Sequence, residues 1–214
     1  MGNKLLYCLT GSWLALVCAG MVVVERHSVR AGQSASSGNG WPVDTHLSRS
    51  ADKPALLIFA HPHCPCTEAM MSEMFRIEAR HPGAFDPTVV FTVPEGGDTS
   101  EWTETSLIQR ARQLQSVKVV FDPGGREAAL FSAKTSGQIM LYDVSGHPLF
   151  TGGITAARGH EGNNDGRKLL EAALTHPDGS LRIFPVFGCG LVVPDAARPQ
   201  KEAGPRPGEH SIWK

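Results

Sequence analysis

The sequence has no excess of basic residues, because its 20 Lys and Arg are matched by 21 Asp and Glu, for a formal net charge of −1. It has no run of Lys or Arg either. Together these facts argue against nucleic acid as a partner, since binding to a phosphate backbone depends on positive charge. The sequence also lacks a phosphate-loop glycine signature, a Ser-His-Asp arrangement and a notable carboxylate pair. Several common kinds of enzyme site are therefore not indicated.

Charge is absent from residues 5–24, which lie between Lys4 and Glu25. About 20 uncharged residues form a helix of about 30 Å, the thickness of a bilayer core. We predict an uncleaved signal anchor over residues 1–25, crossing the cell membrane once, with the rest of the chain on the periplasmic or extracytoplasmic side. A cleaved signal peptide ranks second and a lipoprotein third. An anchor with a cytoplasmic domain is the remaining alternative.

Apolar residues are scarce in two further stretches. Residues 31–40 are small and polar, and such segments bury too little to offset the entropy of ordering them. We therefore predict a flexible linker over residues 26–52 and a disordered tail over residues 194–214. Between them we expect a folded domain over 53–176, followed by a C-terminal extension over 177–193 that carries the last cysteine.

Cysteine is scarce as well, with five in the chain. Cys8 and Cys18 fall in the apolar N-terminal run, where they face lipid or pack. Cys64, Cys66 and Cys189 remain for the folded part. One close pair and one cysteine left over indicate a redox or metal site, and not a scaffold stapled by disulfides.

The folded part alternates strand and helix patterns. Short apolar or β-branched runs predict five strands, at 54–60, 88–93, 117–121, 138–142 and 148–151. Apolar spacing and stop signals predict helices at 67–80, 103–114, 126–133 and 166–175. The early strands should pair in parallel through right-handed crossovers, and the last two should form an antiparallel hairpin. Either Asn164 or Asp165 would cap the last helix.

This order of elements, with a cysteine pair between the first strand and its helix and a closing hairpin, resembles the thioredoxin-like superfamily over residues 50–176. It is most similar to the membrane-tethered bacterial members. The resemblance implies an α/β thioredoxin-like fold, a central mixed sheet flanked by helices, here with one N-terminal transmembrane helix. Residues 152–166 and 187–191 are also faintly similar to RedB-type bacterial proteins, a label that carries no mechanism. Two departures stand out: Pro65 alone separates the cysteines, where the family has two residues, and residues 135–137 hold no cis-proline.

The cysteine turn, His-Pro-His-Cys-Pro-Cys over residues 61–66, places two thiols at the start of a helix. If Cys64 is the N-cap and Pro65 the first helical residue, unpaired N–H groups and the helix dipole stabilise a thiolate there. A protonated His61 or His63 would add to that effect. The turn is therefore a candidate site for a reactive sulfur.

The first functional hypothesis is a thiol–disulfide oxidoreductase that acts on cysteine-containing proteins or small thiols and needs no cofactor. In it Cys64 attacks, Cys66 or Cys189 resolves, and His63 tunes the thiolate. A disulfide across one intervening residue is strained, and hence oxidising and readily reduced. If Cys189 resolves, that strained bond need not form.

The alternative is a metal carrier or assembly factor without enzymatic turnover. Its candidate ligands are Cys64, Cys66, His61, His63 and His160. Thiolates and imidazoles suit copper, as Cu(I), or zinc. Thioredoxin-like copper chaperones are similar in using a cysteine pair and a distant histidine, but their cysteine spacing is three residues and their histidine lies elsewhere. His160 as a plain loop residue, and Cys189 as a buried small hydrophobe, are the competing interpretations.

Overall fold

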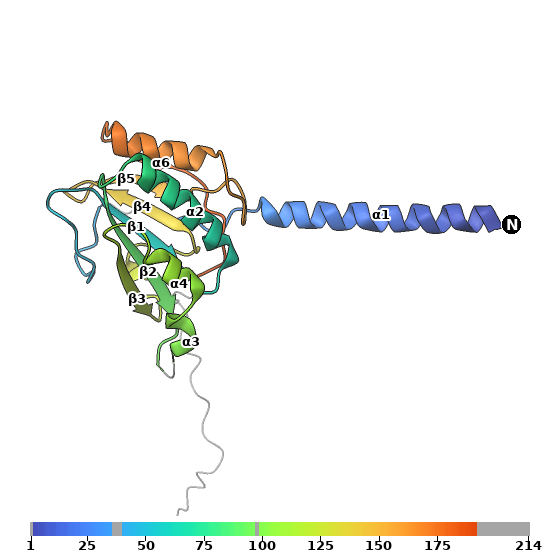
Figure 1. The fold of residues 1–214 in the computed structure, drawn as a ribbon, viewed down its shortest axis with the longest axis horizontal. Coiled ribbons are helices and arrows are strands. Elements are labelled where there is room, and N and C mark those ends of the chain that lie inside the picture. The colour runs from blue at the N-terminus through green and yellow to red at the C-terminus, as the bar shows by residue number, and fades with distance from the viewer. Residues whose placement is uncertain (1, 36–39, 97–98, 192–214) are drawn as a thin grey trace, which may run out of the picture.

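The structure is a computed structural model of the chain and describes residues 2–35, 40–96 and 99–191. A long helix, α1 (Gly2–Ser28), projects away from an α/β domain (Figure 1). Among the described residues it is the one helix long and apolar enough to span a membrane, a test that an N-terminal signal sequence also passes. The tail predicted at 194–214 lies outside the described residues.

A six-stranded mixed sheet forms the centre of the domain, in the order β3-β2-β1-β4-β5-β6. Its strands are β1 (Ala55–Ala60), β2 (Asp86–Val93), β3 (Lys118–Pro123), β4 (Gln138–Tyr142), β5 (Pro148–Gly152) and β6 (Arg182–Ile183). The first three strands pair in parallel, and β4 runs antiparallel to β1 and β5. The predicted parallel pairing and closing hairpin are confirmed. β6, which pairs in parallel with β5, was not predicted.

The helices are α2 (Pro65–Arg80), α3 (Ser100–Thr103), α4 (Ser106–Ala111), α5 (Arg126–Leu130) and α6 (Asp165–Thr175). The helix predicted over 103–114 is confirmed as α4, but it is shorter, because the chain breaks between α3 and α4. There Thr105 caps a new helix, its side chain accepting a hydrogen bond from the Ile108 N–H at 3.3 Å. The cap of α6 is Asn164, one of the two predicted candidates.

The core divides between the two faces of the sheet because side chains alternate along each strand. Leu56 and Ile58 of β1 face α2, α4 and α6, which cover one side of the sheet (Figure 1). Leu57 and Phe59 face the other side, where α5 packs. The buried methionines of α2, among them Met74, belong to the first of these cores, as their helical spacing predicts.

The described part of residues 29–54 contains no helix or strand and packs against the second face of the sheet. The Trp41 ring meets those of Phe131 and Tyr142 edge-on, with centroids 5.2 Å apart in each case. Leu47 is buried. The prediction of a flexible linker over 26–52 did not anticipate these contacts, which supply the apolar surface that its small polar stretch lacks. Its flexibility and the domain boundaries stay predictions.

The C-terminal extension leaves β6 and returns across the sheet toward the start of β4. The Phe184 N–H donates to the Thr151 carbonyl at 3.1 Å, and Val186 is fully buried. A Cβ on Gly152 would lie 2.3 Å from the Phe184 carbonyl oxygen, so only glycine fits at that crossing. The extension therefore packs closely on the domain, and its path carries Cys189 to the cysteine turn.

Candidate active site

Cys64 is the N-cap of α2, with extended backbone angles of φ −88° and ψ 110°. Pro65 follows at the first helical position, where its missing N–H costs no hydrogen bond. The turn itself is closed by the Cys64 N–H, which donates to the His61 carbonyl at 3.1 Å. The sequence predicts this placement, and the structure shows the sulfur of Cys64 at the positive end of the helix dipole.

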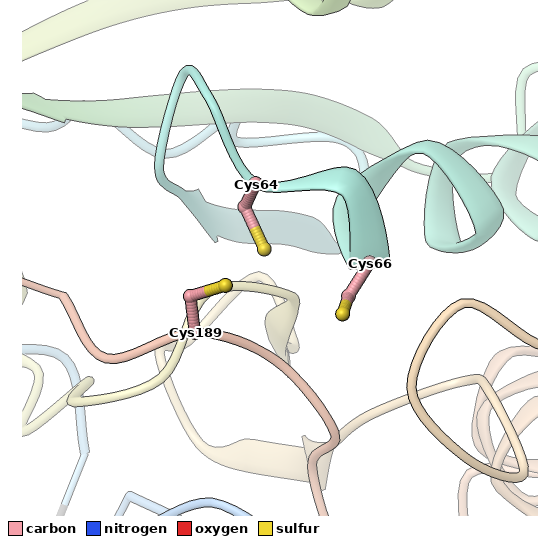
Figure 2. Close-up of side chains that lie close together, drawn as sticks. All are labelled: Cys64, Cys66 and Cys189. Atoms are coloured by element: carbon pink, nitrogen blue, oxygen red, sulfur yellow. The ribbon is translucent and has the colours of Figure 1, made fainter. Parts of the chain in front are cut away.

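Three sulfurs meet at the cysteine turn (Figure 2). Those of Cys64, Cys66 and Cys189 all lie within 4.8 Å of one another, and all three are free thiols. Cys64 is buried, whereas the other two are half-buried. The side chains of Cys64 and Cys189 point toward each other from two segments far apart in the sequence. The structure thus brings the leftover cysteine to the pair, which the sequence left open.

Ser136 occupies the place where the family resemblance leads one to expect a cis-proline. Its hydroxyl lies 2.7 Å from the Thr67 hydroxyl and accepts a hydrogen bond from the His61 N–H at 2.8 Å. Its side chain is fully buried. There is no cis peptide bond in the part of the chain that the structure describes. Sequence reasoning noticed the missing proline but gave no role to Ser136 or Thr67.

These hydroxyls matter because they adjust the acidity of Cys64. Burial raises the pKa of its thiol, but hydrogen bonds from the Thr67 hydroxyl, the Cys189 backbone and thiol, and the Ser136 hydroxyl outweigh burial and lower the pKa to about 7. Burial and the Cys64 thiolate raise the pKa of Cys66. Burial, then the hydrogen bond and charge of Cys64, raise the pKa of Cys189 to about 12. One thiol of the three is therefore prepared to ionise near neutral pH.

The two histidines of the turn contact Trp102 of α3, with ring centroids 5.2 Å from His61 and 5.0 Å from His63. Burial, and then the charge of His63, lower the pKa of His61. A hollow of about 280 Å³ lies beside the turn, between α2 and α4. Within the described ranges, the three cysteines form the one group of potential metal ligands, and neither histidine joins it. Trp102 had no sequence signal that distinguished it.

Arg158 hydrogen-bonds both the segment that carries Cys189 and the end of α1. Its guanidinium donates to the Gly188 carbonyl, and its backbone N–H donates to the carbonyl of Ser28, at the end of α1, at 3.0 Å. Its charge also opposes the rise in the pKa of Cys66. His160 is exposed, and its Nδ1 lies 2.9 Å from the Arg158 carbonyl, so it too stays apart from the sulfurs.

Comparison with known proteins places the fold. A hypothetical protein from Sinorhizobium meliloti aligns over 77% of this chain and 98% of its own, with 16% identity and a TM-score of 0.57. An uncharacterized conserved protein from Geobacillus kaustophilus aligns over 79% and 95%, with 17% identity and a TM-score of 0.53. A putative thiol:disulfide interchange protein DsbE from Chlorobium tepidum aligns over 69% and 99%, with 20% identity and a TM-score of 0.41.

The order of helices and strands and the mixed sheet, with the cysteine turn between β1 and α2, are those of a thioredoxin-like fold. No model of a protein family matches the sequence, and no curated protein is significantly similar to it. At 16% and 17% identity, the two structures with TM-scores above 0.5 bear on the fold and not on the chemistry. The chemistry that this domain can carry out depends on its three thiols.

Proposed function

We propose that the protein is a thiol–disulfide oxidoreductase, anchored in a membrane by α1 with its domain on the extracytoplasmic side. Cys64 is the nucleophile and Cys189 the resolving thiol. The observation that carries the proposal is the sulfur cluster: three thiols within 4.8 Å, of which Cys64 alone has its pKa lowered, to about 7. The partners are cysteine-containing proteins or small thiols. An extracytoplasmic position suits this chemistry, because disulfides persist outside the cytoplasm.

The reaction starts when the Cys64 thiolate attacks one sulfur of a partner disulfide. A bond forms between Cys64 and the partner, the partner's own S–S bond breaks, and the first partner thiolate leaves. Cys189 then attacks the Cys64 sulfur and expels the second partner thiolate, which takes up the proton that Cys189 gives up. The partner disulfide is thereby reduced to a thiol and a thiolate, which takes from water the proton that Cys64 lost on ionising, and Cys64 and Cys189 are oxidised to a disulfide. Run in reverse, the same steps oxidise a partner.

Electrostatics suit this order of events. The charge of the Cys64 thiolate helps to hold the pKa of Cys189 high while Cys64 is free. Once Cys64 is bonded to a partner that charge is gone, so Cys189 ionises more readily at the step that needs its thiolate. The two thiols therefore act in sequence.

Geometry favours Cys189 over Cys66 as the resolving thiol. Cys66 lies two residues beyond Cys64 on the same helix start, and side chains two apart on a helix do not face each other. Cys189 faces Cys64 from a separate segment (Figure 2), and its backbone N–H also hydrogen-bonds the Cys64 sulfur. A Cys64–Cys189 bond needs no strained closure across Pro65.

Three serine variants test the proposal by intact mass after reaction with glutathione disulfide. Cys64→Ser should abolish exchange. Cys189→Ser should accumulate a mixed disulfide at Cys64, because nothing expels the partner. Cys66→Ser, the matched control, should pass on to the Cys64–Cys189 disulfide without accumulating the mixed disulfide. Exchange that survives Cys64→Ser, or accumulation in Cys66→Ser in place of Cys189→Ser, would overturn the proposal.

The cluster also favours a second candidate function, a carrier of a soft metal ion. Three thiolates at this separation suit Cu(I), and zinc with a fourth ligand. Of the ligands predicted from sequence, Cys64 and Cys66 lie in the cluster, whereas His61, His63 and His160 do not. A carrier should retain stoichiometric Cu(I) under reducing conditions, lose it in Cys189→Ser and keep it in His160→Ala. Failure to retain Cu(I) would remove this candidate.

A further inference from the structure

The last described residues, 188–191, form a strap across the cysteine turn. They run antiparallel to residues 134–136, just before β4, in a β-bridge between Thr135 and Gly190. The Ser136 N–H donates to the Cys189 carbonyl and the Leu191 N–H donates to the Lys134 carbonyl, each at 2.8 Å. The strap is thus bound as an added strand, largely by its main chain, as an extended peptide would be.

Glycine before the cysteine is a steric requirement of this arrangement. A Cβ on Gly188 would lie 1.9 Å from the Ser136 carbonyl oxygen, closer than any side chain tolerates. A Cβ on Gly190, in the same strap, would meet nothing within 4 Å. The strap therefore requires glycine at position 188, before Cys189, but not at position 190, after it.

The seated strap also closes the site. Cys64 is only 2% exposed, and the Cys189 backbone N–H hydrogen-bonds its sulfur. On the side of residues 134–136, Cys189 occupies the place that a partner disulfide on an extended chain would take to reach that sulfur. Hydrogen bonds, including that of Arg158 to Gly188, and the packing of Leu191 oppose its departure, but the strap buries little apolar surface, because Gly190 is exposed and Cys189 only half-buried. Segments with little buried apolar surface are the ones that open at low free-energy cost.

We propose that the strap occupies the position that a segment of the partner takes during the reaction. It leaves so that an extended partner segment with glycine before its cysteine pairs with residues 134–136, and it returns to bring Cys189 back to Cys64. The proposal rests on the oxidoreductase function proposed above and adds the shape and sequence of the segment that the site accepts.

The two glycines of the strap provide matched variants of the full chain. Gly188→Ala should unseat the strap and raise the rate at which a bulky polymer-linked maleimide labels Cys64 by about tenfold, the effect of about 1.4 kcal/mol. Gly190→Ala should leave that rate within about twofold of the original. Peptide mapping assigns the label to Cys64, and a thermal melt checks that both variants fold. Equal rates in the two variants would overturn the proposal.

Hydrogen exchange of the unaltered protein gives a second test, in which no substitution can disturb the fold. The Leu191 and Ser136 amides should exchange faster than those of β1, because the strap opens without global unfolding. Protection of both amides equal to that of β1 would contradict a displaceable strap.

Peptide disulfides then test the sequence preference. A disulfide dimer of Gly-Cys-Gly-Leu should form a mixed disulfide with Cys64 of the Cys189→Ser protein about tenfold faster than a dimer of Ala-Cys-Gly-Leu. Equal rates would overturn the glycine requirement and leave the oxidoreductase standing. Exchange with neither peptide nor glutathione disulfide, together with a Gly188→Ala protein whose Cys64 is readily labelled, would instead refute the oxidoreductase and keep the strap.

Discussion

Helix α2 buries polar groups in two places, and the two places satisfy them differently. At its start, the Cys64 sulfur is surrounded by neutral donors, the hydroxyls of Thr67 and Ser136. At its middle, the fully buried Glu73 carboxylate is paired with the guanidinium of Arg167, from α6, and also accepts the Gly162 N–H at 2.7 Å.

The difference separates a structural polar cluster from a reactive one. A buried carboxylate paired with guanidinium is held firmly, because either partner alone would be an uncompensated charge. Neutral donors stabilise the Cys64 thiolate enough to lower its pKa to about 7 but give it no fixed counter-charge. A sulfur in that setting is ionised and still able to attack. The polar network around Glu73 thus stabilises the fold, whereas the network around Cys64 leaves a reactive sulfur.

The largest expected effect comes from the structural cluster. Glu73→Gln leaves Arg167 buried without its carboxylate, and the free energy of unfolding should fall by about 3–5 kcal/mol. The pH at which Cys64 becomes half-labelled by iodoacetamide should not move. Denaturant unfolding measures the first quantity. Glu95→Gln, which alters an exposed ion pair to Arg126 that shares no residue with this cluster, is the control and should cost less than about 1 kcal/mol. A shift in the Cys64 midpoint in Glu73→Gln would show that the networks are coupled.

The next effect is expected from Ser136→Ala, which touches both roles. It leaves the buried Thr67 hydroxyl and the His61 N–H without their partner, so the free energy of unfolding should fall by about 1–3 kcal/mol. It should also raise the Cys64 midpoint, though less than loss of the Thr67 hydroxyl does, because its hydrogen bond to the sulfur lowers the pKa less. Unchanged stability would show that water replaces the serine hydroxyl.

Thr67→Val removes the donor that lowers the Cys64 pKa most, with little change in volume. Because the thiolate is the reactive form, labelling rises with pH through the pKa, so the midpoint should move upward from about 7, by about one unit. At pH 7 the labelling rate should drop by several fold, with stability changed by about 1 kcal/mol. A midpoint that stays near 7 would show that the helix dipole, and not the Thr67 hydroxyl, lowers the pKa of Cys64.

The smallest effect is expected from His63, to which the sequence assigned the tuning of the thiolate. Its side chain is exposed and faces Trp102, and the groups that set the Cys64 pKa are Thr67, Cys189 and Ser136. His63→Gln should move the labelling midpoint by a few tenths of a unit at most, and less at high salt. A shift as large as that of Thr67→Val would restore the tuning role.

Local patterns account for what the sequence predicts well. The cysteine turn, the start of α2 and the five strands depend on apolar runs and on Pro65, which act within a few residues. The break between α3 and α4 had a readable signal, because Thr105 and Ser106 come just before the apolar Leu107. The periodic apolar pattern favoured a longer helix instead. β6 is only two residues long, too short to leave a pattern.

The missing parts of the site depend on long-range contacts. Cys189 reaches the turn because main-chain pairing with residues 134–136 and the absence of a Cβ at Gly188 guide the extension there. No periodicity encodes such a path. Ser136 and Thr67 are small polar residues of a kind found in any loop, and only their burial beside a sulfur gives them a role. The available hint was the missing proline before β4.

The most direct test of the central claim is a disulfide map of the full chain after oxidation in air. Free thiols are alkylated under denaturing conditions and the linked peptides are identified by mass, with the native mass recorded in parallel. We expect that Cys64 is linked to Cys189 and that Cys66 is alkylated. A Cys64–Cys66 link would contradict it, as would three alkylated thiols in a protein whose native mass includes copper or zinc.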